Sequence, residues 1–185
     1  TENQGLAEAR NTGIKHSTGF YILPLDSDDK IEATYLQHAV DILNENENIG
    51  IVYGRALYFG EKEGEWNLEF AELDKIIFYN QIYASAFYRR ADFEKVGGYD
   101  SGMKYGWEDW EFWLAILELG REIKFIDKIC FYYRIVNGSM VRSMTDEHRK
   151  YLQQRVYSRH SKLYEPYFSD PISLYSSFTY YKNEF

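Results

Sequence analysis

The sequence has a single cysteine, Cys130, so it cannot form an internal disulfide, and nothing in it indicates an oxidising compartment. No apolar run is long and uncharged enough to suggest a transmembrane helix, and no signal-peptide pattern is visible. Positive charge is also scarce, because 21 Lys and Arg against 29 Asp and Glu give a formal net charge of -8. This balance argues against a nucleic-acid partner, and a phosphate-bearing ligand would need a bridging metal ion.

The residues that are abundant indicate one globular domain. Of the 185 residues, 45% are hydrophobic and 27% are charged, which is typical of a folded domain with a substantial core. Aromatic side chains are frequent, with 18 Tyr, 12 Phe and 4 Trp. Core and surface packing explains most of them, and a platform for sugar rings is the sharper alternative. Composition does not choose between the two.

Apolar periodicity alternates between helical and strand spacing along the chain. Leu6, Ala9 and Ile14 are expected to share one helix face, and the clearest helix carries a stripe of two Trp and two Leu residues and ends at Gly120. We predict helices at 5–19, 33–48, 90–96, 108–120 and 145–164, and strands at 20–25, 49–60, 83–90, 122–126 and 130–136. This interleaving predicts an α/β architecture.

Three carboxylates, those of Asp26, Asp28 and Asp29, directly follow the predicted buried strand at 20–25. One of them would be enough to cap the next helix, and a solvated turn is less common directly after an apolar strand. A hard cation such as Mg²⁺ or Mn²⁺ would relieve their repulsion and keep positions open for water and phosphate. We therefore favour a metal site, at the strand end where ligands bind in α/β sheets.

A second acidic pair, Glu108 and Asp109, opens the clearest helix. Acidic residues favour helix N-termini through capping and the helix dipole, whatever their function. The same position suits a catalytic base, because the positive helix end keeps the carboxylate ionised. The residues alone favour neither the structural nor the catalytic interpretation over the other. Glu111, further along the helix, is expected at the surface.

Three motifs in this order resemble the glycosyltransferases of family two. They are "ARNTGI" followed by an aromatic strand and "LDSDD", then "GGYD" followed by "GWEDWEFWLAI", and finally "YYRIVNGSMVR". Together they extend from Glu2 to about Arg142. Members of this family are inverting, sugar-nucleotide-dependent enzymes with the GT-A fold. The resemblance therefore implies a GT-A-like, Rossmann-like mixed sheet flanked by helices.

The resemblance also implies a role for each acidic residue. Asp26 would lie near the ribose and the metal, Asp28 would be the best metal ligand, and Asp29 would be a neighbour or a cap. The metal, Mg²⁺ or Mn²⁺, would bind the donor diphosphate. Asp109 would be the base that deprotonates the acceptor hydroxyl, and Glu108 would contact the acceptor or donor sugar.

Other motif residues become candidates for ligand contacts by the same resemblance. Arg10 and Asn11 would lie near the nucleotide, although a solvated surface arginine is the default on such a helix. Gly97 and Gly98 would border the donor sugar, although an ordinary turn also explains them.

Five further residues are assigned either a ligand contact or a structural role. Trp107 is placed to stack on a sugar from just before the helix, whereas Trp110 is expected in the core. Arg142 would reach a diphosphate as a loop closes, or would be an exposed loop arginine. His38 and His148 are expected to be structural or solvated, because neither has a ligand partner at metal spacing.

The expected function is metal-dependent transfer of a sugar from a nucleotide-sugar donor to a carbohydrate or lipid-linked acceptor. The expected setting is surface polysaccharide synthesis in the cytoplasm, peripheral to the inner face of the membrane. A non-catalytic sugar- or nucleotide-binding module and a metal-dependent phosphohydrolase are the alternatives.

Residues 1–165 are expected to form the GT-A-like domain, and 166–185 an extension. In the family, two strand–helix units precede the acidic run, whereas only 25 residues precede Asp26 here. We therefore expect an N-terminally truncated domain that lacks part of its nucleotide site and is weakly active at most. One sheet edge would then be open to self-association.

Overall fold

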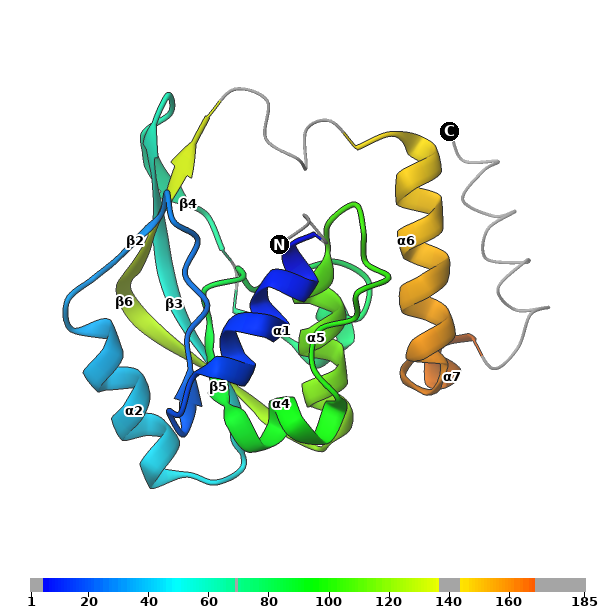
Figure 1. Cartoon of the computed structure of the whole chain (residues 1–185), viewed down its shortest axis with the longest axis horizontal. Helices are drawn as coiled ribbons and strands as arrows, with labels where there is room; N and C mark the ends of the chain where they lie inside the picture. Colours follow the sequence, from blue (N-terminus) through cyan, green and yellow to red (C-terminus); the bar gives the residue numbers. More distant parts are fainter. Residues whose placement is uncertain (1–4, 69, 137–143, 169–185) are drawn as a thin grey trace, which may run out of the picture.

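The computed structural model describes residues 5–68, 70–136 and 144–168 of the chain. Its sheet has the strand order β1-β5-β3-β6-β2, with β4 paired to β3 (Figure 1). The strands are β1 Tyr21–Ile22, β2 Lys30–Ile31, β3 Ile49–Gly60, β4 Gly64–Trp66, β5 Phe87–Arg89 and β6 Glu122–Ile135. The helices are α1 Leu6–His16, α2 Tyr35–Glu45, α3 Leu73–Ile76, α4 Arg90–Val96, α5 Glu108–Glu118, α6 Asp146–Arg159 and α7 Ser161–Phe168.

The two long strands β3 and β6 run parallel at the centre of the sheet, and the other pairs are antiparallel. Their carboxyl ends therefore lie side by side, with Tyr58 opposite Tyr133. Such an end of a mixed sheet is where α/β proteins place ligands. The architecture is the predicted mixed sheet flanked by helices.

Two apolar layers hold the helices against the sheet. On one side, α1, α4 and α5 pack on the larger core, whose fully buried members include Trp113 and Phe112. On the other side, α2 covers a smaller core with Tyr35, Ala39 and Leu43 (Figure 1). The sheet is thus buried on both faces by helices, as the long apolar strand β3 requires.

Several predicted strands differ from the structure in length or number. The strand expected at 20–25 is reduced to Tyr21–Ile22, because it is at the end of the sheet and Pro24 has no N–H to donate. The two strands expected at 122–126 and 130–136 are the single strand β6. The pairing with β3 shifts register there, so the intervening polar residues are skipped rather than forming a turn.

The first and last helices also depart from the expectation. In α1 the buried face is Ala7, Asn11 and Ile14, whereas Leu6 and Ala9 are exposed. The helix expected at 145–164 is divided at His160 into α6 and α7. The predicted domain boundary at 165/166 falls inside α7, and the domain division remains a prediction.

Three short elements, β2, β4 and α3, have no counterpart in the sequence prediction. Within the described ranges, no helix is long and apolar enough to span a membrane.

Candidate active site

A cavity of about 470 Å³ lies at the carboxyl ends of the central strands. Residues of α1, of the acidic run, of the segment 80–85 and of the start of α5 line it together with the ends of β3, β4 and β6. The three sequence motifs, far apart in the chain, therefore meet at one cavity.

Arg10 of α1 connects the two acidic groups of the cavity. Its Nη2 lies 3.1 Å from Oδ1 of Asp26, and its Nη1 donates to Oε1 of Glu108. The Arg10 side chain is only 9% exposed. Burial lowers its pKa, but the carboxylates of Glu108 and Asp26 outweigh this and raise the pKa above its usual value. The guanidinium therefore stays charged, which balances part of the negative charge at this site.

Asn11, the next residue, is a structural link rather than part of the cavity lining. Its side chain accepts a hydrogen bond from the Tyr99 backbone N–H and donates one to the Tyr99 carbonyl, both at 2.8 Å. Gly98 has a φ of +85°, and a Cβ there would lie 2.8 Å from the Asn11 Oδ1. Glycine at this position therefore permits the loop 97–107 to approach α1 closely.

Asp109 is held at the N-terminus of α5 with both carboxylate oxygens hydrogen-bonded. Oδ1 accepts from the Trp110 backbone N–H at 2.7 Å, and Oδ2 accepts from the Asn80 amide at 3.0 Å. Burial and the adjacent Glu108 raise the pKa of Asp109 to about 7, against the opposing effect of Arg10. A carboxylate that titrates near neutral pH and lines a cavity is suited to general base chemistry.

Trp107 immediately precedes this acidic pair in a left-handed conformation, with φ 61° and ψ 16°. It is the one non-glycine residue with positive φ in the part of the chain that the structure describes. Such backbone strain persists when the surroundings hold the residue in place. Trp107 lines the cavity, and Trp110 is buried in the core as predicted.

The acidic run contributes two of its carboxylates to the cavity lining. Asp26 and Asp29 line it, whereas the exposed Asp28 does not. Oδ1 of Asp29 accepts from the Arg134 backbone N–H at 2.8 Å, and burial raises the pKa of Asp29 to about 6. Asp29 caps no helix, because β2 follows it and α2 begins only at Tyr35.

The described residues contain no ready-made metal cluster of three or more His, Cys, Asp or Glu side chains. The acidic run instead offers hard oxygen ligands at the edge of an open cavity, which leaves coordination positions for a ligand. Asp28 also approaches Arg134, whose Nε donates to the Asp28 carbonyl at 2.8 Å. The metal-ligand roles of Asp26 and Asp28 remain predictions.

The structure thus gathers five of the predicted site residues at the cavity: Arg10, Asp26, Trp107, Glu108 and Asp109. It places four others away from the lining: Asn11, Asp28, Gly97 and Gly98. Arg142 lies outside the described residues. Sequence reasoning missed Asn80, Arg134 and the aromatic residues of β3, β4 and β6. Only the alternation of Phe131 and Tyr133 in the strand predicted at 130–136 gave a signal for any of them.

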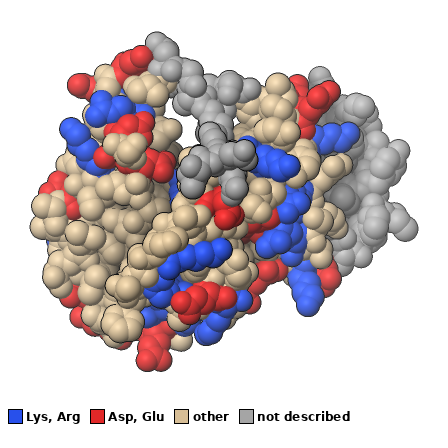
Figure 2. Space-filling model, viewed as in Figure 1, with Lys and Arg blue, Asp and Glu red and all other residues tan. Residues whose placement is uncertain are grey.

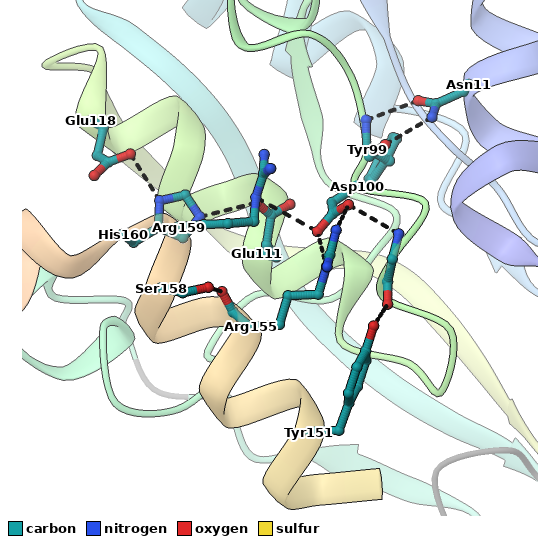
Figure 3. A network of polar contacts seen from close by, with 11 residues as sticks. Asn11, Tyr99, Asp100, Glu111, Glu118, Tyr151, Arg155, Ser158, Arg159 and His160 are labelled. Carbon is teal, nitrogen blue, oxygen red and sulfur yellow. Dashed lines mark hydrogen bonds and ion pairs between the residues drawn. The ribbon is translucent and has the colours of Figure 1, made fainter.

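Glu111 is buried, which corrects the expectation that it lies at the surface (Figure 3). Its Oε1 accepts from Arg159 Nε at 2.5 Å and lies 3.1 Å from His160 Nε2. The other ring nitrogen of His160 lies 2.8 Å from Oε2 of Glu118. The C-terminal end of α6, with Arg159 and His160, therefore covers this face of α5 and supplies the partners of its carboxylates.

The same helix, α6, holds the loop 97–107 (Figure 3). Arg155 makes two hydrogen bonds to the Asp100 carboxylate, at 2.5 and 2.7 Å, and Tyr151 donates to the Gly102 carbonyl at 3.1 Å. The ring of Tyr105 stacks on that of His148 with centroids 3.8 Å apart. These contacts support the loop that leads directly into the acidic pair of α5.

The fold and the cavity define an α/β protein with two carboxylate groups facing one another across a buried arginine. The family model of glycosyl transferase family 2 matches residues 1–112. The chain therefore belongs to glycosyl transferase family 2. A PGL/p-HBAD biosynthesis glycosyltransferase of Mycobacterium bovis (strain BCG / Pasteur 1173P2) is 31% identical over 112 residues. This match covers 60% of the chain and 43% of the relative, so the chain spans less than half of that protein.

Solved structures confirm the predicted GT-A-like fold. S. aureus TarS 1–349 in complex with UDP-GlcNAc matches with a TM-score of 0.63 at 17% identity, covering 88% of this chain and 54% of that one. The mannosyltransferase PcManGT from Pyrobaculum calidifontis, in complex with GDP-Man and Mn²⁺, matches with a TM-score of 0.59 at 19% identity, covering 90% and 48%.

Proposed function

We propose that this chain carries the catalytic site of a metal-dependent, inverting glycosyltransferase. The enzyme moves a sugar from a nucleotide-sugar donor to a hydroxyl group of a carbohydrate or lipid-linked acceptor. The observation that carries the proposal is the joining of Asp26 and Glu108 by Arg10 in one cavity, with Asp109 beside them. Surface polysaccharide synthesis in the cytoplasm, at the inner face of the membrane, is the proposed setting.

Asp109 acts as the base in this reaction. In its ionised form it accepts the proton of the acceptor hydroxyl, while the hydroxyl oxygen forms a bond to the anomeric carbon of the donor. The bond from that carbon to the diphosphate oxygen breaks, and its electron pair leaves with the nucleoside diphosphate. Attack opposite to the leaving group inverts the anomeric configuration. Because the pKa of Asp109 is about 7, the base is ionised above neutral pH.

A divalent metal fits the residues of the acidic run when a diphosphate completes its coordination. Asp26 and Asp28 would hold Mg²⁺ or Mn²⁺, with Asp29 beside them, because carboxylate oxygens suit hard cations. When bound, the metal supplies Lewis-acid stabilisation to the departing diphosphate. Arg10 contributes a second positive charge, and its buried Nε has no hydrogen-bond partner among the described residues. A ligand group would satisfy that donor.

The test measures nucleoside diphosphate released by this chain from UDP-GlcNAc or GDP-mannose, in Mn²⁺, with and without a mixture of β-pyranosides as acceptors. These two donors are chosen because the TarS and PcManGT structures contain them. We expect release that depends on acceptor. Release that is equal without acceptor indicates a phosphohydrolase, and donor binding without any release indicates a binding module.

In an active form of the enzyme, Asp109→Asn is expected to lower turnover by roughly 100-fold or more, because it removes the base. Donor affinity should stay nearly unchanged, as judged by calorimetry with UDP-GlcNAc or GDP-mannose. Glu108→Gln is the matched variant, since it neutralises the neighbouring carboxylate and leaves the base in place. A larger loss of turnover in Glu108→Gln than in Asp109→Asn would reverse the two roles.

A further inference from the structure

The cavity has a second wall that differs from the charged one. Its residues are the half-buried rings of Tyr58 on β3, Trp66 on β4 and Tyr133 on β6, which we call the aromatic wall. The Tyr58 and Trp66 rings stack with centroids 5.3 Å apart and an angle of 19°, and Tyr133 lies 5.2 Å from Trp66. The charged wall is formed by Arg10 and the two acidic groups.

Strand register explains why these rings gather. Tyr58 is directly opposite Tyr133, and the small residue Ala56 is opposite Trp66. Residues two apart on a strand share a face, so Ala56 and Tyr58 present the same face of the sheet. The fully buried Ala56 and the glycine opposite Tyr58, Gly64, leave room for larger neighbours. The wall is therefore built on three hydrogen-bonded strands, which gives it a fixed position.

We propose that the aromatic wall binds the pyranose ring of the acceptor, an inference that rests on the proposed glycosyltransferase function. A pyranose has an apolar C–H face and a rim of hydroxyl groups. The C–H face gains free energy when it leaves water and packs on a flat aromatic surface. The hydroxyl rim needs polar partners at the edge of that surface. The ammonium of Lys62 lies 4.6 Å from the Tyr58 ring centroid, beside the wall. The indole N–H of Trp66 adds a hydrogen-bond donor to this wall.

Continuity with the base assigns this wall to the acceptor rather than to the donor. Asp109 is hydrogen-bonded to Asn80, and the chain from Asn80 to Tyr83 lines the cavity. The Tyr83 ring then lies 6.4 Å from Trp66. The diphosphate of the donor requires the positive charge of Arg10 and a metal, which belong to the charged wall. The donor therefore occupies the charged wall, which leaves the aromatic wall for the ring of the acceptor, whose hydroxyl must reach Asp109.

The experiment uses saturation-transfer difference NMR on the chain, with irradiation of its aromatic protons. The probes are the methyl β-pyranosides of glucose, galactose and N-acetylglucosamine, and sorbitol is the acyclic control. We expect at least one pyranoside to receive saturation on its ring C–H protons, and sorbitol to receive little. Absence of transfer to all three pyranosides overturns the subsite.

Variants of the wall give the sharper test. Trp66→Ala should weaken binding of the responding pyranoside roughly tenfold, whereas Trp66→Phe should keep it within about threefold, because stacking needs an aromatic face. Phe20→Ala is the matched control, since Phe20 is 87% exposed and does not line the cavity. Equal binding by parent and Trp66→Ala overturns the proposal. If Trp66→Ala does not fold, Tyr58→Leu replaces it in the test, and we expect the same loss of affinity for the pyranoside.

Competition separates this proposal from the proposed function. Adding UDP-GlcNAc or GDP-mannose with Mn²⁺ should leave the Trp66-dependent pyranoside signal in place, and its loss would reassign the wall to the donor sugar. If neither donor binds and none is turned over while the Trp66-dependent signal persists, the wall is a sugar site but the transferase function fails. If donor is turned over and the Trp66 variants match the parent, the transferase stands and the wall assignment fails.

Discussion

At the scale of single residues, the environment of Asp109 connects the structure to a pH dependence. Burial and Glu108 raise its pKa to about 7, while the hydrogen bond from Asn80 favours the ionised form. Activity of the parent should therefore rise with pH through about 7, as the base loses its proton. Asn80→Ala removes a donor to the ionised carboxylate, so its acid limb should move to higher pH. The pH profile of kcat/KM measures this, and a shift toward lower pH would contradict the assignment of Asp109 as the base.

Two adjacent glycines offer a matched test of backbone strain. Both have positive φ, 86° at Gly97 and 85° at Gly98, but only at Gly98 would a Cβ meet other atoms, namely Asn11 Oδ1 and the Phe93 ring. Gly97→Ala should cost about 1 kcal/mol from φ alone, and Gly98→Ala about 3 kcal/mol because the Asn11–Tyr99 link must also shift. Urea unfolding measures both. Equal costs would mean that the close approach to α1 contributes nothing to stability.

Sequence reasoning reached the residues whose chemistry is local, such as the Glu108–Asp109 pair at a helix start. It failed for Glu111, because an acidic residue one turn inside a helix gives no sign of partners that lie 48 and 49 residues later. Asn80 was missed for the same reason, since its role exists only through contact with Asp109.

At the scale of elements, His160 at the C-terminal end of α6 joins this helix to α5. Both ring nitrogens of His160 face carboxylates, Glu111 and Glu118, which accept but do not donate when ionised. Burial lowers the pKa of His160, but these two partners outweigh that effect and raise it. A raised histidine pKa stabilises the fold fully below the ordinary value of 6.5, and this contribution is lost as pH rises through the raised value.

His160→Gln should therefore lower stability by about 2 kcal/mol at about pH 6, since it breaks a buried hydrogen bond to a charged group. The difference from the parent should shrink at about pH 9. Asp109 titrates in both proteins and so cancels in the difference. His38→Gln on α2 is the matched control. Urea unfolding at the two pH values measures the effect, and a difference that grows with pH would show that His160 is neutral in the fold.

The elements that were predicted correctly are those that the pattern of their own side chains determines. The stripe of α5 predicted its buried face because a helix is formed by its own residues, and Gly120 ends it with a φ of 78°. Strands depend on partners distant in sequence. The sequence therefore predicted two strands, 122–126 and 130–136, although pairing with β3 carries β6 through the residues between them. The short strand β2 is strand only because β6 lies beside it.

At the scale of the whole molecule, the fold was predictable because three motifs with fixed spacing define it together. The walls of the cavity were only partly predictable. The charged wall comes from those motifs, whereas the aromatic wall arises from β3, β4 and β6, whose register no local pattern specifies. Lys and Arg side chains lie among Asp and Glu on the face in Figure 2, so no broad basic area is visible there to attract a phosphate.

The net charge of -8 predicts that a nucleoside diphosphate and a divalent metal ion bind to this protein cooperatively. A nucleoside diphosphate is itself an anion, so it should bind weakly alone, and Mn²⁺ alone should bind weakly because the described residues offer no cluster of three ligands. Together they neutralise one another, and each supplies what the other lacks. We therefore expect Mn²⁺ with UDP or GDP to raise the Tm by more than the sum of the separate effects.

Asp26→Asn and Asp28→Asn should each remove this excess. Asp127→Asn is the control, because it deletes the same charge from an 85% exposed side chain that does not line the cavity. Differential scanning fluorimetry measures the shifts, and an excess that survives in both Asp26→Asn and Asp28→Asn would place the metal elsewhere.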